Sequence, residues 1–334
     1  MKSFLSALKL SFSIVGAVIG AGFISGREIV SFFYGQDVFF VATFVFVGFF
    51  LTILFFFFGK NVENNLLFNL SQPFLLAAEL VMMSGMLAAI GSFQQQFFTL
   101  DAKIPILAAV CVIISNIVLY FDVDGIEKVN AFLVPFMLFV VLIATLPTGE
   151  FNPPTTFAVK PFNLVSYTGL NVYLSSVLIM RLGSGEKMSV KILSAIISSL
   201  IIAATIYIIG SSLFTEERSV LSADIPLLAL LKDFGLIYYP FCAALAFGVF
   251  TTLLSSHYPL FLFVENGKWT VFNRIILSVV ALIISETGFY NIVSYFYPAV
   301  GVFGAVVITA LFVSTVFFPQ RQRRRTSDLR ANIK

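Results

Sequence analysis

Charged residues are scarce in this chain, at 11% of its 334 residues, whereas a typical soluble domain carries about 25%. So little charge cannot cover a water-facing surface, and we therefore expect lipid to solvate most of the chain. Cys111 and Cys242 are the two cysteines and His257 is the single histidine. This excludes a disulfide framework and a His/Cys metal centre. The absence of a GxxxxGK[ST] stretch excludes ATP hydrolysis through a P-loop.

The chain also lacks the side-chain sets that common catalytic sites require. It shows no recognisable catalytic histidine, paired aspartates or Ser/Lys pair. We therefore predict a protein that is not an enzyme and holds no organic cofactor.

Apolar residues are abundant instead, at 59% of the chain, and phenylalanine alone occurs 41 times. A membrane-spanning helix needs about 20 mostly apolar residues. Ten apolar segments of about this length follow one another, at residues 8–32, 37–59, 74–99, 104–121, 127–146, 162–181, 191–214, 235–258, 270–285 and 289–318. The sequence therefore predicts an all-α integral membrane protein with ten transmembrane helices.

The distribution of positive charge predicts the orientation of these helices. With the N-terminus inside, the cytoplasmic segments hold fourteen Lys and Arg residues and the outer segments hold five. Cytoplasmic loops are the ones enriched in Lys and Arg. We therefore expect a multi-pass protein of the bacterial cytoplasmic (inner) membrane with both termini in the cytoplasm.

The longest outer connection, residues 147–161, falls near the middle of the chain. It separates a first five-helix repeat, residues 1–146, from a second, residues 162–318. An odd number of spans per half gives the halves opposite orientations, which is the inverted-repeat plan of many secondary transporters. Residues 319–334 form a basic cytoplasmic tail, which we expect to contact lipid and not nucleic acid.

The first apolar segment contains four glycines, Gly16, Gly20, Gly22 and Gly26. Each costs about 1 kcal/mol of helix propensity relative to alanine. One interpretation is close helix packing through small residues. The other is an unwound stretch around residues 20–22, whose free amides would face an anion and whose free carbonyls would face a cation.

The sixth segment would be the counterpart of the first in the second repeat. It mixes Gly169 and Asn171 with hydroxyl residues and two tyrosines, one of them Tyr167. An asparagine at membrane depth is costly unless it is hydrogen-bonded. It would either bond a neighbouring helix or mark a second, substrate-facing discontinuity.

The stretch Gly16-(x)3-Gly20-Ala21-Gly22-Phe23 resembles the first helix of the amino acid–polyamine–organocation superfamily. Residues 18–29 are similar to a bacterial branch of it, the YkvI-like membrane proteins. The resemblance runs through all ten segments. It implies the LeuT fold, a five-plus-five inverted repeat with discontinuous helices one and six, and alternating-access transport.

The eighth segment carries a second part of the resemblance. In sodium-coupled members of this fold, a small residue and two adjacent hydroxyl residues on helix eight face helix one. The resemblance therefore implies a Na⁺ site formed by Gly16, Ile19, Gly248, Thr251 and Thr252. The alternative is that both threonine hydroxyls bond their own helix.

Three ionisable residues are candidates for proton coupling or gating. Glu79 follows Pro73 by six residues in an apolar helix, and an intramembrane carboxylate suggests function. It would either carry a proton or reach the nearby inner interface. Arg27 and Glu286 would either pair as an outer gate, as the resemblance implies, or remain ordinary interfacial charges.

Together these observations predict a secondary transporter of a small solute, coupled to Na⁺ or H⁺. The amides of Gly20, Ala21, Gly22 and Phe23 would bind the solute's anionic group, which indicates an amino acid or a related zwitterion. Tyr167 and Asn171 would line the opposite side. The alternative is a membrane receptor on the same fold that senses a small solute without transporting it. The sequence does not indicate an oligomeric state.

Overall fold

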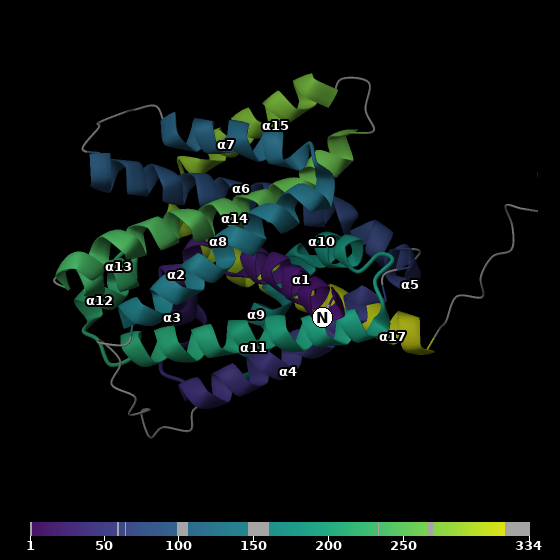
Figure 1. Cartoon of the computed structure of the whole chain (residues 1–334), viewed down its shortest axis with the longest axis horizontal. Helices are drawn as coiled ribbons and strands as arrows, with labels where there is room; N and C mark the ends of the chain where they lie inside the picture. The colour runs from purple at the N-terminus through teal and green to yellow at the C-terminus, as the bar shows by residue number, and fades with distance from the viewer. Residues whose placement is uncertain are drawn as a thin grey trace, which may run out of the picture.

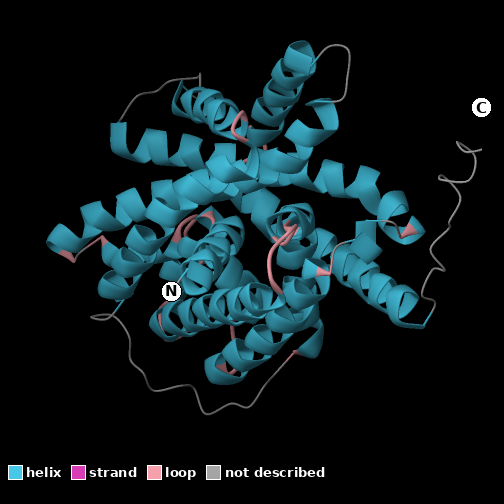
Figure 2. Ribbon diagram, turned by 45° about the vertical axis from the view of Figure 1, so that its right-hand side comes forward, coloured by secondary structure: helices cyan, strands magenta, loops and turns pink. Residues whose placement is uncertain are grey.

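The computed structural model describes residues 2–58, 60–63, 65–98, 106–145, 160–232, 234–265 and 270–317. Throughout these residues the chain forms helices joined by short turns, without a strand (Figure 2). The predicted all-helical architecture is confirmed. The basic tail and nearly all of the predicted outer connection lie outside the described residues.

Six stretches are long and apolar enough to cross a membrane within the described ranges, or seven if the bent pair α9–α10 counts as one span. The helices that form them are α4 (Val38–Phe57), α6 (Leu66–Phe98), α8 (Asp122–Thr145), α9 (Pro161–Leu174), α10 (Ser176–Leu182), α11 (Met188–Leu213), α14 (Tyr238–Glu265) and α17 (Tyr297–Phe317). Three shorter apolar helices are α1 (Lys2–Val18), α7 (Ile106–Leu119) and α15 (Thr270–Ser285). Every predicted apolar segment is thus helical, whereas ten membrane crossings remain a prediction.

The remaining elements are short. They are α2 (Ala21–Ile24), α3 (Arg27–Phe33), α5 (Lys60–Glu63), α12 (Arg218–Ser222), α13 (Pro226–Leu231), η1 (Gly235–Ile237), α16 (Phe289–Asn291) and the π-helical turn η2 (Ile292–Phe296). One boundary corrects the prediction. Helix α6 begins at Leu66 and runs through Pro73, so Pro73 lies inside the helix and does not start it.

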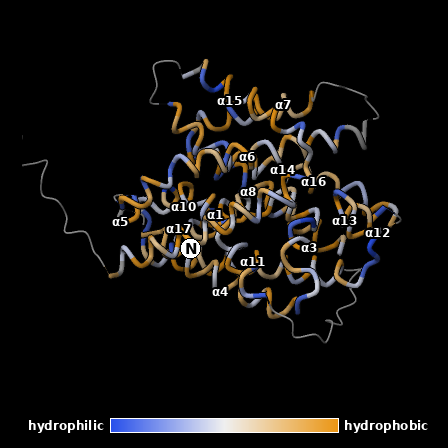
Figure 3. The backbone as a smooth tube through the Cα atoms, turned by 180° about the vertical axis from the view of Figure 1, so that it is seen from behind, coloured by the Kyte–Doolittle hydropathy of each residue, from blue (hydrophilic) through white to orange (hydrophobic). Residues whose placement is uncertain are grey.

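Large apolar side chains cover the outside of the helix bundle. Phe39, Phe132 and Phe312 are 62%, 76% and 51% exposed, and apolar positions dominate the surface helices (Figure 3). Such a surface is stable in lipid and aggregates in water. The exposed phenylalanines therefore support a multi-span membrane protein.

Helix α1 lies in the middle of the bundle and packs against α8, α11 and α14 (Figure 1). The contacts of the first half correspond to those of the second. Helix α1 packs on α8 and α11, and its counterpart α9 packs in the same way on α17 and α4. Helix α14 packs on α8, and its counterpart α6 packs on α17. Helices α4 and α11 are each other's counterparts in the two halves and pack together, as do α6 and α14. The two groups of five segments thus share one contact pattern.

The first segment is interrupted twice. Helix α1 ends at Val18 and α2 starts at Ala21, with Gly20 extended between them at φ −101° and ψ −161°. The second interruption precedes α3, where Gly26 has a φ of 77°, a conformation that glycine adopts without steric cost. The break expected around residues 20–22 is therefore present.

The sixth segment is also interrupted. Helices α9 and α10 meet at an angle of 56°, at Ser175. Gly169 and Asn171 both lie within α9, so the break comes about one turn later than these residues suggested. Gly169 serves close packing instead, because an added Cβ would overlap the backbone of Gly301 and Ala305 on α17.

Candidate functional site

The break between α1 and α2 frees a carbonyl group in the buried core. The amide of Gly20 bonds the carbonyl of Val18 at 3.0 Å, so it does not complete the helical bond to Gly16. The hydroxyl of Thr252 on α14 donates to the Gly16 carbonyl instead, also at 3.0 Å. Thr252 is 2% exposed. The site thus begins with one main-chain oxygen and one hydroxyl from two different helices.

The other predicted Na⁺ ligands lie close by, with differing roles. Thr251 donates to the carbonyl of Gly248 on its own helix at 3.0 Å, which is the alternative considered above. Gly248 packs on α2, where an added Cβ would overlap the Ile24 side chain. Ile19 is fully buried at the break. The Gly16 carbonyl and the Thr252 hydroxyl both offer oxygen atoms, the ligands that a hard cation prefers.

The structure adds Asn130 of α8 to this region. Its side chain is fully buried, and its Nδ2 donates to the carbonyl of Ser13 at 3.4 Å. A Cβ added at Gly16 would lie 2.9 Å from the Asn130 carboxamide, while Oδ1 makes no hydrogen bond to the described residues. The sequence argument that flagged Asn171, an amide at membrane depth, applies equally to Asn130 and would have identified it.

The predicted solute-binding residues lie in the core but do not form one open cavity. Gly20, Ala21, Gly22 and Phe23 are all buried. On the sixth segment, Tyr167 and Asn171 are 0% and 4% exposed, and Asn171 bonds the Tyr167 carbonyl of its own helix at 3.1 Å. Helix α2 packs mainly on α3 and α14, whereas α9 packs on α3 and α1.

A cavity of about 100 Å³ lies beside α2. Ala21 and Ser25 contribute to its wall, and the rest comes mainly from α6, α7 and α14, through residues such as Ile90, Cys111 and Val249. The lining is almost entirely apolar. Of the predicted solute-binding residues only Ala21 reaches this cavity, so the cavity and the α9 tyrosine are separate parts of the region.

Glu28, which the sequence analysis did not single out, is buried beside α2. Its acidic side chain is 2% exposed. A Cβ added at Gly22 would overlap its carboxyl group. The carboxyl group thus occupies the space that glycine leaves open on α2. A solute carboxylate bound to the α2 amides would face this acidic group.

Arg27 is held away from Glu286. Its guanidinium donates to the carbonyl of Ala223 and lies over the Tyr290 ring, 4.9 Å from the centroid. Glu286 is exposed, and the described residues contain no ion pair between it and Arg27. The predicted gate pair is therefore absent from this conformation, because Tyr290 and the Ala223 carbonyl already hold the guanidinium.

The part of the chain around Ala223, whose carbonyl accepts a hydrogen bond from Arg27, also covers the second break in the first segment. The amide of Leu227, at the start of α13, donates to the carbonyl of Ser25 at 2.9 Å. Its neighbour α12 ends just before the Ala223 carbonyl that accepts from Arg27. Helices α12 and α13 therefore close over the end of α2.

Glu79 lies deep within α6, the most buried of the candidate spans. Its side chain is 1% exposed, and Oε1 has no partner within the described chain. Because α6 begins at Leu66, Glu79 lies about 20 Å along the helix from its start at 1.5 Å per residue. Glu79 is therefore buried among other helices, and a proton-carrying role remains the functional prediction.

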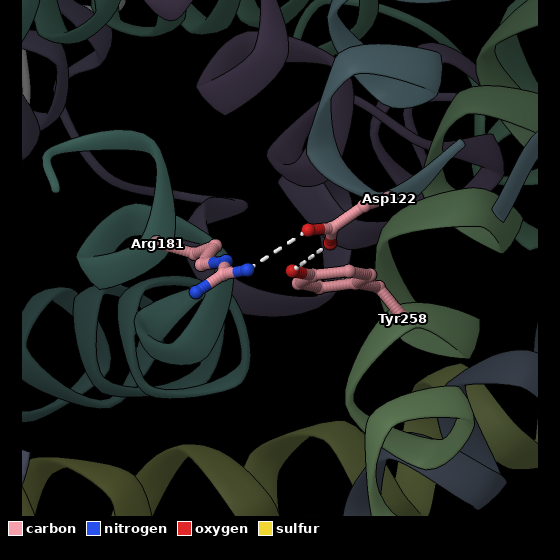
Figure 4. Close-up of polar contacts among 3 residues, drawn as sticks. All are labelled: Asp122, Arg181 and Tyr258. Atoms are coloured by element: carbon pink, nitrogen blue, oxygen red, sulfur yellow. Dashed lines mark hydrogen bonds and ion pairs between the residues drawn. The ribbon is translucent and has the colours of Figure 1, made fainter. Parts of the chain in front are cut away.

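A polar cluster joins three helices at the opposite end of α1 from the breaks. Arg181 of α10 pairs with Asp122 of α8 at 2.9 Å, and the Tyr258 hydroxyl of α14 donates to the other Asp122 oxygen at 2.6 Å (Figure 4). A cleft of about 620 Å³ lies next to it, lined by Glu63, Arg181 and other residues. Sequence reasoning did not foresee this contact.

Comparison with known proteins supports a membrane protein without specifying an activity. No protein-family profile matches the chain. Two Bacillus subtilis (strain 168) proteins are similar along nearly their whole length. "Uncharacterized membrane protein YkvI" is 28% identical over 96% of this chain and 98% of that protein. "Uncharacterized protein YyaD" is 24% identical over 92% and 96%, respectively. The first likeness agrees with the predicted resemblance to YkvI-like proteins.

Proposed function

We propose that this chain is a secondary active transporter of a small solute, working by alternating access in the bacterial cytoplasmic membrane. The observation that carries the proposal is the break between α1 and α2 in the buried core. Irregular backbone at membrane depth is tolerated where protein or a wet cavity covers it, and transporters place substrate and ion sites there. The second break, at Ser175 between α9 and α10, supports the same plan.

The shared contact pattern of the two groups of five segments also supports the proposal. An inverted repeat of the LeuT type pairs helix one with helix six and helix three with helix eight. The correspondence of α1–α8 with α9–α17, and of α8–α14 with α6–α17, fits that pairing. The two repeats would then rock about the site between them, with both termini in the cytoplasm.

The coupling ion in this proposal is Na⁺ held near Gly16 and Thr252, or H⁺ carried by Glu79. The oxygen donors beside the first break favour a cation there. The buried carboxyl group of Glu79, without a partner for Oε1 among the described residues, favours a proton on α6. Either ion would stabilise one conformation of the bundle and so link its gradient to solute movement.

The test is uptake by the purified full-length protein in proteoliposomes. A panel of radiolabelled amino acids is offered under an inward Na⁺ gradient, an inward H⁺ gradient, or neither. Accumulation that requires one gradient supports the proposal and identifies the ion. Solute binding without uptake under any gradient contradicts transport and supports the receptor alternative.

A further inference from the structure

Glu28 is a buried acid without an electrostatic partner in the described chain. Its Oε2 makes no hydrogen bond there, and no described residue forms an ion pair with it. A buried carboxylate without a partner costs several kcal/mol. The neighbouring Arg27 does not compensate it, because the Ala223 carbonyl and the Tyr290 ring hold that guanidinium.

Two phenol groups from other helices share this position. Tyr167 of α9 and Tyr297 of α17 are 0% and 1% exposed, and neither hydroxyl has a hydrogen-bond partner among the described residues. Helix α3, which carries Glu28, packs against α9 and against η2, whose last residue directly precedes Tyr297. Aromatic packing fixes Tyr167, because its ring lies 4.8 Å from that of Phe33 on α3, the helix that carries Glu28.

Two glycines leave room for two of these side chains. A Cβ on Gly22 would overlap the Glu28 carboxyl group, and a Cβ on Gly85 of α6 would lie 3.4 Å from the Tyr297 hydroxyl. The three oxygens make no hydrogen bonds within the described chain, so a ligand that binds them would displace no existing bond. The cavity beside Ala21 begins one residue away along α2.

We propose that Glu28, Tyr167 and Tyr297 form a buried site for a small positively charged group, either an ammonium group or Na⁺. An ammonium group has three N–H donors, which matches three unpartnered oxygens, and its charge would compensate the carboxylate. The next inference rests on the transporter proposed above. In that transporter, this site indicates that the solute carries an amino group. The solute's amino group would then be recognised by side chains of α3, α9 and α17.

The experiment measures binding to the purified full-length protein by thermal stabilisation. Methylammonium and ethylammonium test the amine, propionate of similar size tests the carboxylate, and NaCl against choline chloride tests Na⁺. We expect amines or Na⁺ to raise the melting temperature and propionate to leave it unchanged. Glu28→Gln should weaken the response at least about tenfold, as removal of a charge-assisted bond would. Tyr167→Phe and Tyr297→Phe should weaken it less.

Glu217→Gln is the matched control, because that carboxyl group is exposed and should not affect the response. A carbodiimide that labels buried carboxyl groups gives a second readout, with Glu79 as the internal reference. Methylammonium or Na⁺ should slow the labelling of Glu28 and not that of Glu79, as followed by peptide mass spectrometry. This measurement needs no variant and therefore does not depend on how Glu28→Gln folds.

The outcomes separate this site from the transport proposal. Stabilisation by neither amines nor Na⁺, or an undiminished response in Glu28→Gln, overturns the site even if solute uptake is observed. Equal protection of Glu28 and Glu79 from the carbodiimide also overturns it. Amine binding that depends on Glu28, without uptake of any amine, supports the site and contradicts transport.

Discussion

The hydroxyl of Thr252 on α14 donates to the carbonyl of Gly16 on α1 across 3.0 Å. The contact exists because the Gly20 amide turns to Val18 and leaves Gly16 without its helical donor. A side chain of the eighth segment thus stabilises the broken end of the first. An ion that replaces this hydrogen bond would bind α1 and α14 at the same time. Its binding would therefore depend on the distance between the two helices.

Replacing Thr252 with valine should destabilise the protein by about 1–3 kcal/mol, the cost of leaving a buried polar group unsatisfied. Valine preserves the shape of threonine and removes only the hydroxyl. The measurement is denaturation of the purified protein in detergent. If Na⁺ binds here, Thr252→Val should weaken the stabilisation of the protein by Na⁺.

Thr251→Val is the control for this prediction. Its hydroxyl bonds Gly248 within a continuous helix, so the loss should cost less than that of Thr252. Equal destabilisation by the two variants would contradict the special role of the freed Gly16 carbonyl.

Gly20→Ala should disrupt the break and abolish solute uptake. An added Cβ would lie 2.8 Å from the Cβ of Thr252, so α1 and α14 would have to separate. Gly91→Ala in α6 is the matched control, because an added Cβ there has nothing within 4 Å, and alanine should favour the helix by up to about 1 kcal/mol. Normal uptake and melting in Gly20→Ala would show that the close approach at the break is dispensable.

Local physical chemistry made a broken first segment one of two interpretations of its glycines, the other being close helix packing. Glycines at Gly16, Gly20, Gly22 and Gly26 weaken a helix wherever they occur, and the structure interrupts the segment at two of them, Gly20 and Gly26. The proximity of Gly16 to Thr252 followed from the family resemblance, since residues 236 positions apart leave no local signal of contact.

Burial of Glu28 was not predictable in the same way. The adjacent Arg27 and Glu28 look like a charged end of a spanning helix, where both would reach water. The left-handed turn at Gly26 starts a new helix at Arg27 and places the carboxyl group against Gly22. The outcome depends on the direction of a turn and on the packing of α9 and α17, neither of which a charge pattern encodes.

Helix α6 shows a second limit. A proline often occupies the first turn of a helix, so Pro73 suggested a helix start. The preceding residues instead continue the helix back to Leu66. This places Glu79 further from the start of its helix than the sequence indicated.

Arg181→Ala should change stability by less than about 1 kcal/mol, because its side chain and that of Asp122 are 56% and 47% exposed. Its larger effect should be on opening. The contact ties α8, α10 and α14 at the end predicted to be cytoplasmic, so its loss should favour access from that side. The measurement is thiol labelling of Ser176→Cys, a fully buried position on α10.

The labelling is done in a background where Cys111 and Cys242 are replaced by serine. Lys187→Ala serves as the control, because Lys187 is also basic and exposed and forms no ion pair within the described residues. Faster labelling in Arg181→Ala and not in Lys187→Ala is the expected result. Equal rates in all three proteins would count against a gating contact at this end.

Asn130→Ala should separate a structural from a ligand-binding role for this amide. The variant loses a long 3.4 Å hydrogen bond to Ser13 but also removes an oxygen, Oδ1, that has no partner in the described chain. These effects oppose each other, so we expect a stability change below about 1 kcal/mol. If Oδ1 contacts an ion beside Gly16, stabilisation by Na⁺ should fall at the same time.

Asn116→Ala on α7 is the matched variant, because its Nδ2 bonds the Val112 carbonyl of its own helix at 2.9 Å. It should leave the response to Na⁺ unchanged. Melting temperatures of the three proteins with NaCl and with choline chloride give the comparison. Loss of several kcal/mol of stability in Asn130→Ala, with the native response to Na⁺ retained, would assign Asn130 to packing between α1 and α8 alone.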